Sequence, residues 1–534
     1  MLSKYRDRKL NSIRLEYPLL YFKKLIGLIN KIISNGGFFA KVSVYRLFYK
    51  KIKTNSEISG QDLERIRYLS AVTPFWSIVT CVGVFSTILL LKNLYISTLF
   101  VIPIIIYVYP LLISELKRAE YLKGLESEMF PFSILLYLNS LLGKGIGTVL
   151  SDVKSSNLFN NLKREVELVE RDSLINGKSL SMTIKSRSRL LARHILADMY
   201  MKVITSEFTG VSLKERTRDI VKELSTSLSE LYKDYVERAT EITEVIFALF
   251  LLFPLTALGF QFLGNGNNIL ILLLPLGLAP PIILWISIIQ PNMGYRVKLK
   301  GWQWTALVCS TALLVIPISN LEYRVIGLVL VSQLILYPSY SEIKNSDKIF
   351  KDFLNILALV SDYTRLGRGI RQSLLNIDLD NFSGPTFKFL MKLKSLIRES
   401  KPLSMAETGN TFLNQLLGVL DILDRKGSDS LMVIHETMNI ISELHDSRRR
   451  LSLQLRSFSV LALLTPLLLW FTTTSLSFIS STPAGWINNL NLTYSLVIAA
   501  VYSKIYKFTL INPPLYLTVV LLSLTLSMIP HPIL

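Results

Sequence analysis

The sequence predicts an all-α, polytopic membrane protein with about nine transmembrane helices and two cytosolic helical-bundle domains. Three observations indicate this class. Apolar stretches of about 20 residues recur, and that length lets a helix cross a bilayer. Long polar blocks show helical periodicity, and one short pattern occurs twice. The chain has 534 residues, of which 50% are hydrophobic, and its mean hydropathy of +0.41 is high for a protein without membrane segments.

The chain begins with a strongly basic segment, residues 1–69, which has 15 Lys and Arg residues against 5 Asp and Glu residues. Between residues 19 and 29 apolar side chains recur at helical spacing, with lysines among them. This pattern is typical of an amphipathic helix on a membrane surface. A cytosolic helix packed on the next domain is an equally good interpretation of the same residues.

Apolar stretches then follow in pairs, and only a few polar residues separate the two members of each pair. Each pair is therefore expected to form a transmembrane hairpin. The predicted hairpins are residues 70–113, 243–289 and 302–340, and three further transmembrane helices are expected in residues 457–534.

Two long polar blocks lie between these membrane segments, at residues 114–242 and 341–456. Late in each block an apolar stripe recurs at helical spacing, in residues 213–235 and 430–446. We expect each block to fold as a helical domain in the cytosol.

The distribution of positive charge predicts the orientation, because Lys and Arg accumulate on the cytosolic side of membrane proteins. With the N-terminus in the cytosol, 57 of the 59 Lys and Arg residues are cytosolic, and only Lys92 and Arg324 are outside. The C-terminus is then outside a multi-pass plasma-membrane protein. We assign the net charge of +20 to membrane anchoring rather than to nucleic acid binding.

The repeated pattern lies once in each polar block, and its copies are 224 positions apart. It reads Leu-Gly-Lys-Gly-Ile from Leu142 and Leu-Gly-Arg-Gly-Ile from Leu366. In each copy an apolar helix should end at the first glycine, which adopts the left-handed conformation without strain, and a second helix should follow. The plain interpretation is two glycine-capped corners. The alternative is a surface that contacts a partner.

No catalytic residue, cofactor site or metal site is predicted from the sequence, and the chain is not expected to be an enzyme. Cys81 and Cys309 lie in apolar stretches, and the four histidines show no ligand spacing. A phosphate-binding loop needs a longer spacing between its glycines and then Ser or Thr, and neither copy fits. The predicted spans lack ionisable residues at their centres, which argues against an ion-coupled transporter.

Together these features resemble the F-domain family of type II secretion and type IV pilus platform proteins. Residues 130–146 and 353–370 look like that family's opening helix, glycine turn and next helix. Gly210 and Gly427, each before a late helix, resemble its second half. The duplication and the size are most similar to the archaeal branch, the platform proteins of the archaellum and adhesive pili, which are relatives of the tight-adherence C proteins.

The resemblance implies a non-enzymatic platform that couples a hexameric secretion ATPase in the cytosol to the insertion of pilin subunits into a filament. It leaves the oligomeric state open, with a homodimer as one arrangement. The alternatives are a polytopic transporter and a membrane scaffold without a pilin partner. On this basis we expect the following residues to face the ATPase: Gly143, Lys144, Gly145, Lys214, Gly367, Arg368, Gly369, Arg425 and Lys426.

Two further sites are predicted near the membrane. Arg448, Arg449 and Arg450 directly precede an apolar span and are expected to bind anionic lipid headgroups. Asn491 begins an Asn-Leu-Thr sequon that the predicted topology places at the outer face, which makes it a candidate for glycosylation.

Overall fold

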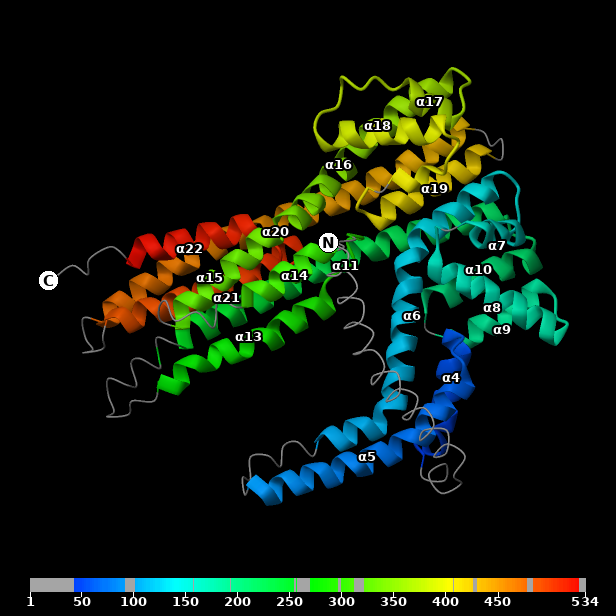
Figure 1. Cartoon of the computed structure of the whole chain (residues 1–534). Helices are drawn as coiled ribbons and strands as arrows, with labels where there is room; N and C mark the ends of the chain where they lie inside the picture. Colours follow the sequence, from blue (N-terminus) through cyan, green and yellow to red (C-terminus); the bar gives the residue numbers. More distant parts are fainter. Residues whose placement is uncertain are drawn as a thin grey trace, which may run out of the picture. The chain divides into compact units, whose positions relative to one another are not determined.

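The computed structural model describes residues 43–91, 101–156, 158–192, 194–253, 256, 269–295, 299–311, 321–406, 408–425, 430–477 and 484–527. These residues are almost entirely helical (Figure 1). The β structure among them is one isolated bridge, between Tyr295 and Asn410. The prediction of an all-α fold is confirmed.

The helices run in chain order as follows. The first part of the chain has α3 (Val44–Leu47), α4 (Tyr49–Ser59), α5 (Leu63–Leu91), α6 (Val101–Leu141), α7 (Ile146–Ser155), α8 (Asn160–Asn176), α9 (Leu180–Leu190), α10 (Ile195–Thr209), α11 (Leu213–Phe247) and the π-helix η2 (Ala248–Leu252). The second part has α13 (Ile269–Ile289), α14 (Gly301–Ser310), α15 (Leu321–Ile335), α16 (Tyr337–Arg365), α17 (Ile370–Asn376), α18 (Pro385–Arg398), the 3₁₀-helix η4 (Leu403–Ala406), α19 (Thr411–Arg425), α20 (Ser430–Ser477), α21 (Ala484–Lys507) and α22 (Pro513–Ser527).

Contacts divide the chain into two compact units. Unit 1 comprises Met1–Met129 and Val153–Val211, and unit 2 comprises Phe130–Asp152 and Ser212–Leu534. The last turns of α6 and the corner after it therefore belong to unit 2. The predicted alternation of cytosolic and membrane segments, with its domain boundaries, stays a prediction.

In unit 1 the start of α8 is capped by a residue distant in sequence. The carboxylate of Glu128, on α6, accepts hydrogen bonds from the backbone N–H of Asn161 at 3.1 Å and of Leu162 at 2.9 Å. These N–H groups have no partner within the helix, so the carboxylate satisfies them and its charge suits the helix dipole. Burial nevertheless raises the pKa of Glu128, although the N–H donors act in the opposite direction.

The polar part of unit 2 is a bundle of four helix segments: the end of α6, the first half of α11, α16 and the first half of α20. Ser140 of α6 and Thr217 of α11 share a hydrogen bond of 2.6 Å. Farther along, Ser447 of α20 donates to Ser229 of α11 at 3.4 Å. Apolar residues at helical spacing on each segment fill the space between them, which is the pattern the sequence predicted for residues 213–235 and 430–446.

Contacts at two levels establish the direction of these segments. Tyr137, near the end of α6, faces Glu436, near the start of α20; burial and then that carboxylate raise the pKa of the Tyr137 phenol. Earlier on α6, the ring of Phe130 stacks on that of Phe412 with centroids 5.8 Å apart, and Phe412 lies 6.3 Å from Phe350 of α16. Phe350 also stacks on the ring of His445, which lies nine residues after Glu436 on α20. Segments α6 and α16 therefore run antiparallel to α20, and α11 runs parallel to it.

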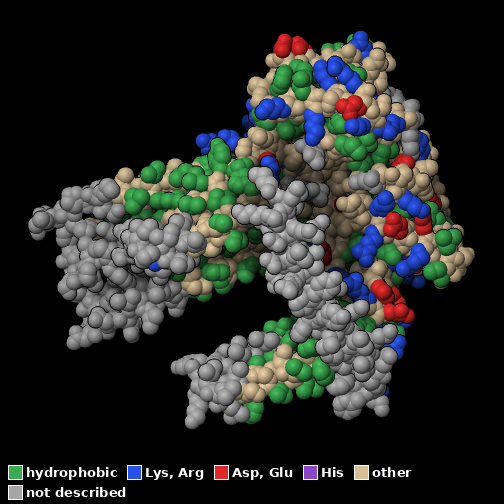
Figure 2. Space-filling model, in the orientation of Figure 1, with side chains coloured by type: hydrophobic (Ala, Val, Ile, Leu, Met, Phe, Trp, Pro, Cys, Tyr) green, Lys and Arg blue, Asp and Glu red, His purple; other side chains and the backbone are tan. Residues whose placement is uncertain are grey.

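The remaining helices of unit 2 are more apolar. Backbone carbonyls near the end of α21 accept side-chain hydrogen bonds: Ile505 from Tyr235 at 2.9 Å, Phe508 from Gln290 at 2.7 Å and Leu510 from Gln333 at 3.2 Å. On the face that Figure 2 shows, apolar side chains cover much of α20 to α22, whereas charged side chains gather around α16 to α19.

Among the described residues, two helices are long and apolar enough to cross a membrane, Leu63–Ser86 and Leu431–Phe471. A third is added if Ile326–Ile335 and Tyr337–Arg365, which meet at a bend of 51°, form one span. Two shorter apolar helices, Pro275–Ile289 and Pro513–Leu526, also occur. These helices fit a membrane protein, but the predicted count of nine spans is not confirmed.

Candidate docking surface

The first corner follows the end of α6 and has the conformation that the sequence predicted. Gly143 has a φ of +70°, a conformation that side chains with a Cβ rarely adopt. The N–H of Lys144 turns back to the carbonyl of Asn139 at 3.0 Å, and α7 begins at Ile146. The corner is therefore a closed turn that exposes Gly143 and Gly145 and half-exposes the side chain of Lys144.

The second corner is built in the same way but is attached to a further helix. Gly367 has a φ of +78°, and the guanidinium of Arg368 lies over the ring of Tyr363 at 5.6 Å. The carboxylate of Asp424, at the end of α19, accepts hydrogen bonds from the N–H of Ile370 at 2.7 Å and of Arg371 at 3.2 Å. A Cβ on Gly369 would lie 3.2 Å from that carboxylate, so this glycine makes room for the cap of α17.

An ion network strengthens the attachment of the second corner. Arg371 donates through Nε at 2.7 Å and Nη2 at 2.5 Å to one oxygen of Asp421, and through Nη2 at 3.0 Å to the carbonyl of Lys401. The other oxygen of Asp421 lies 3.3 Å from Arg425, whose side chain is 47% exposed. In the first corner the residue in the place of Arg371 is Gly147, which has no side chain to make such bonds.

Both corners lie at one end of the bundle, the end at which α20 begins. The first corner is there because α6 runs antiparallel to α20 and places Tyr137 beside Glu436. The second is there because Asp424, which caps it, lies six residues before the start of α20 at Ser430. We call this region, residues 142–146 and 366–370 with the adjacent ends of α11 and α19, the corner end.

The structure brings most of the predicted ATPase-facing residues together at the corner end. Lys214 lies on the exposed first turn of α11, and the Ser140–Thr217 hydrogen bond holds that turn beside the first corner. Arg425 lies beside the second corner through Asp421. Lys426 and Gly427 lie outside the described residues. Whether these residues contact an ATPase stays a prediction.

Some of the basic side chains at the corner end form ion pairs within the protein, and others do not. Arg371 and Arg425 share Asp421, whereas Lys144, Lys214 and Arg365 form no ion pair within the described part of the chain. Solvated cations of this kind are available to an acidic partner, and salt should weaken their attraction to it.

The three consecutive arginines of α20 have different surroundings. The guanidinium of Arg448 lies over the ring of Phe350 at 4.3 Å and that of Phe412 at 5.8 Å, and it donates to the carbonyl of Met293 at 3.4 Å. Arg449 and Arg450 are exposed. Only these two present free side chains, so the predicted lipid contact is now confined to them and is still a prediction.

Asn491 lies within α21, and only 8% of its surface is exposed. A glycan needs an accessible side chain, so its attachment would require this part of the helix to open. Glycosylation at this position stays a prediction.

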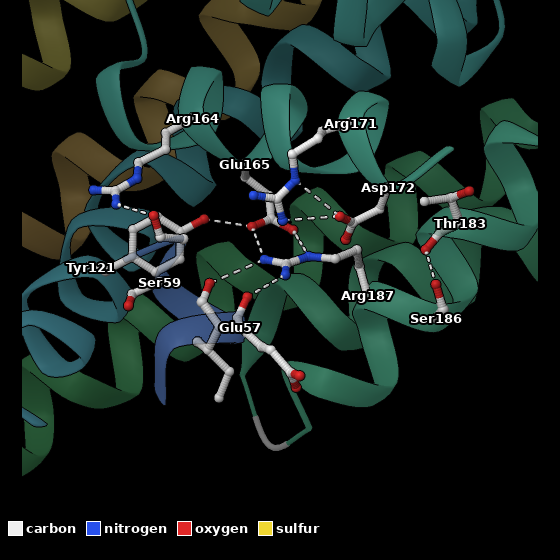
Figure 3. Close-up of polar contacts among 12 residues, drawn as sticks. Glu57, Ser59, Tyr121, Arg164, Glu165, Arg171, Asp172, Thr183, Ser186 and Arg187 are labelled. Carbon is white, nitrogen blue, oxygen red and sulfur yellow. Dashed lines mark hydrogen bonds and ion pairs between the residues drawn. The ribbon is translucent and has the colours of Figure 1, made fainter. Parts of the chain in front are cut away.

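Among the residues whose burial is described, the most buried charged cluster lies in unit 1 (Figure 3). Arg187 of α9 and Glu165 of α8, exposed by 1% and 0%, form a two-bond ion pair with distances of 3.0 and 2.6 Å. Tyr121 of α6 donates to the same carboxylate at 2.5 Å. Burial lowers the pKa of Arg187, but the hydrogen bonds and charge of Glu165 outweigh it and leave this pKa above its ordinary value.

Arg187 also caps the end of α4. Its Nη1 and Nη2 donate to the carbonyls of Glu57 at 2.8 Å and Ile58 at 3.1 Å. A cation there satisfies free carbonyls and suits the negative end of the helix dipole. The cluster joins four helices and is closed to solvent, so we assign it to folding rather than to substrate binding. In the described ranges no group of three or more His, Cys, Asp or Glu residues has the geometry of a metal site.

Sequence reasoning missed the residues that hold the second corner, Asp421, Asp424 and Arg371. Their spacing at helical intervals looked like an ordinary solvated face. The sequence signal that could have identified them is a difference between the two copies of the repeated pattern. Arg371 stands where the first copy has Gly147.

Comparison of the chain with protein-family models, with curated proteins and with solved structures found no match.

Proposed function

We propose that this chain is the plasma-membrane platform of an archaeal type IV pilus-like filament. In this role it is not an enzyme. It receives motion from a hexameric secretion ATPase at its cytosolic corner end and passes it to the membrane segments, beside which pilin subunits enter the filament. The nine spans, the cytosolic N-terminus and the outer C-terminus belong to this proposal.

One observation carries the proposal: the two glycine corners, far apart in the sequence, meet at one end of a single bundle. Helix α16, which leads into the second corner, directly follows the apolar helix α15, and α20 runs without a break from Ser430 to Ser477. A partner bound at the corner end would therefore act on a helix whose second half is apolar enough to lie in a bilayer. This arrangement suits a coupling device that has no energy source of its own.

A transporter and a scaffold without a pilin partner are the alternative functions. A transporter needs polar or ionisable groups along a path through the membrane. Residues 457–471, in the apolar half of α20, contain no Asp, Glu, Lys or Arg, so this segment offers no ionisable group for such a path. No specific observation favours a scaffold over a platform.

The test uses cells in which the chain carries an affinity tag. We expect the full chain, solubilised from membranes, to co-purify with the secretion ATPase of the same cell, and we expect deletion of the gene to remove surface filaments. Filaments that persist after deletion, together with an ATPase that stays in the unbound fraction, would reject the proposal. Substrate flux in reconstituted vesicles would support the transporter instead.

A further inference from the structure

The corner end contains a glycine that the fold does not require. Gly145 is outside the left-handed region, and a Cβ built on it would meet no atom within 4 Å. Gly143 needs its positive φ, and Gly369 needs the space beside Asp424, but neither reason applies to Gly145. It lies just before α7, where Ser would stabilise the helix start slightly more than Gly.

A glycine without an internal role suits close approach by another molecule, because it exposes backbone without a side chain. Lys144 beside it carries a positive charge and forms no ion pair where the structure describes the chain, and Lys214 is held nearby on α11. The first corner therefore combines an open backbone surface with two free cations.

The second corner has a similar surface, and contacts with two aspartates hold it in place. Asp424 and Asp421 fix the turn and the start of α17. Arg368 and Arg365 form no ion pair with any described residue, and Leu366 is 73% exposed beside them. The two corners thus present similar shapes and the same sign of charge, and the second is also capped by the carboxylate of Asp424.

From these observations we propose that the corner end is a two-point docking surface, on which the two corners of one chain bind two neighbouring subunits of the same oligomeric protein through acidic side chains. This inference rests on the proposed function, since it takes the hexameric ATPase as that oligomer. The chain carries two similar corners, and a ring-shaped oligomer carries the same binding site on each of its subunits. Each corner can therefore bind that site on a different subunit.

Two-point binding makes a quantitative prediction. When one contact has formed, the second is intramolecular, and it increases the overall affinity by about 10²- to 10⁴-fold. Loss of either corner should remove this gain with a hexameric partner. With a monomeric partner only one contact forms at a time, so loss of one of two equal sites should reduce binding about twofold.

The experiment measures the affinity of the full chain, in lipid nanodiscs, for the hexameric ATPase and for a monomeric form made by substitution at its subunit interface. The chain variants are Lys144→Glu, Arg368→Glu and Gly145→Ser. Gly145→Ser keeps the fold and tests the open backbone surface alone. Glu126→Gln, on an exposed face of α6, is the control.

Each corner variant should weaken hexamer binding at least about 100-fold and monomer binding about twofold, and the control should change neither. Gly145→Ser should also leave the melting temperature unchanged or slightly higher. Equal loss with hexamer and monomer would overturn two-point docking and leave a single contact site. Absence of binding between the wild-type chain and either form would instead reject the proposed function.

Discussion

Ser140 on α6 and Thr217 on α11 share a hydrogen bond of 2.6 Å, although 77 positions separate them in the sequence. The bond lies a few residues from the first glycine corner, and it places Lys214 beside that corner. On the other side of the bundle, Asp424 ties the second corner to α19. Two different hydrogen-bonded contacts therefore hold the duplicated corners at the same end of the bundle.

Replacement of Asp424 by Ala should loosen the second corner. The N–H groups of Ile370 and Arg371 lose their acceptor, which should cost about 1–2 kcal/mol of stability. Hydrogen exchange should accelerate in α17. Asp362→Ala, at an exposed position of α16, is the control. Unchanged exchange in α17 would show that the cap contributes nothing.

Replacement of Arg187 by Met should be much more costly than replacement of an exposed arginine. The change leaves the carboxylate of Glu165 buried without its ion-pair partner, a loss of about 3–5 kcal/mol. The melting temperature of the purified chain in detergent measures the effect. Arg171→Met, which breaks the exposed pair with Asp172, should change stability by less than about 1 kcal/mol.

The double variant Glu165→Gln with Arg187→Met tests the cause. It removes both charges, so it should be more stable than Arg187→Met alone. A double variant that is less stable than Arg187→Met would mean that lost packing, and not a stranded charge, explains the effect.

The raised pKa of Glu128 predicts a pH dependence. The folded protein binds a proton at Glu128 more tightly than the unfolded chain, whose carboxyl titrates near 4.5. The contribution of this carboxyl to stability is therefore complete below pH 4.5 and declines as pH rises through the raised folded-state pKa. Melting temperatures of wild type and Glu128→Gln across this range measure the difference.

We expect the stability of wild type relative to Glu128→Gln to fall as pH rises above 4.5. Glu126→Gln, at an exposed position two residues earlier, should not show this trend. A relative stability that rises with pH would contradict the direction of the shift.

The arginines of α20 should separate into two roles. Arg448→Ala removes the guanidinium from above Phe350 and Phe412 and should lower stability by about 1–2 kcal/mol. Arg449→Ala should leave the melting temperature of the purified chain in detergent unchanged but weaken its binding of added anionic lipid. If both variants affect stability and lipid binding alike, the separation is wrong.

The two glycine corners should lie on the same side of the membrane. Cysteines introduced by Lys144→Cys and Arg368→Cys, with Cys81 and Cys309 replaced by Ser, should react with an impermeant thiol reagent only when the cytosolic face is open. Reaction of the two cysteines from opposite faces of the membrane would reject both the predicted topology and the docking proposal.

Local patterns in the sequence were sufficient to predict the late helices and the two glycine corners. The left-handed glycines at 143 and 367 follow from where each apolar helix ends, and the late helices follow from their apolar stripes. The predicted boundaries between domain and membrane stay predictions. Residues 430–446 and the span after them form one helix, because no glycine or proline interrupts the chain at Arg448 to Arg450.

Tertiary partners could not be predicted in the same way. Arg187 lies in a polar helix beside Lys185 and Arg189, so nothing in its spacing distinguishes it from a solvated residue. Only the fold brings Glu165, Tyr121 and the end of α4 around it. The same is true of Arg371, whose two aspartates lie some 50 positions away in the chain.

The continuity of α20 gives the molecule a mechanical property. At 1.5 Å per residue, its 48 residues form a rod about 72 Å long. A tilt of only about 5° about one end would carry the other through about 6 Å, which is more than one helical turn. A small swing imposed on the first turns of this rod would thus appear at its apolar end as a sideways displacement of about 6 Å.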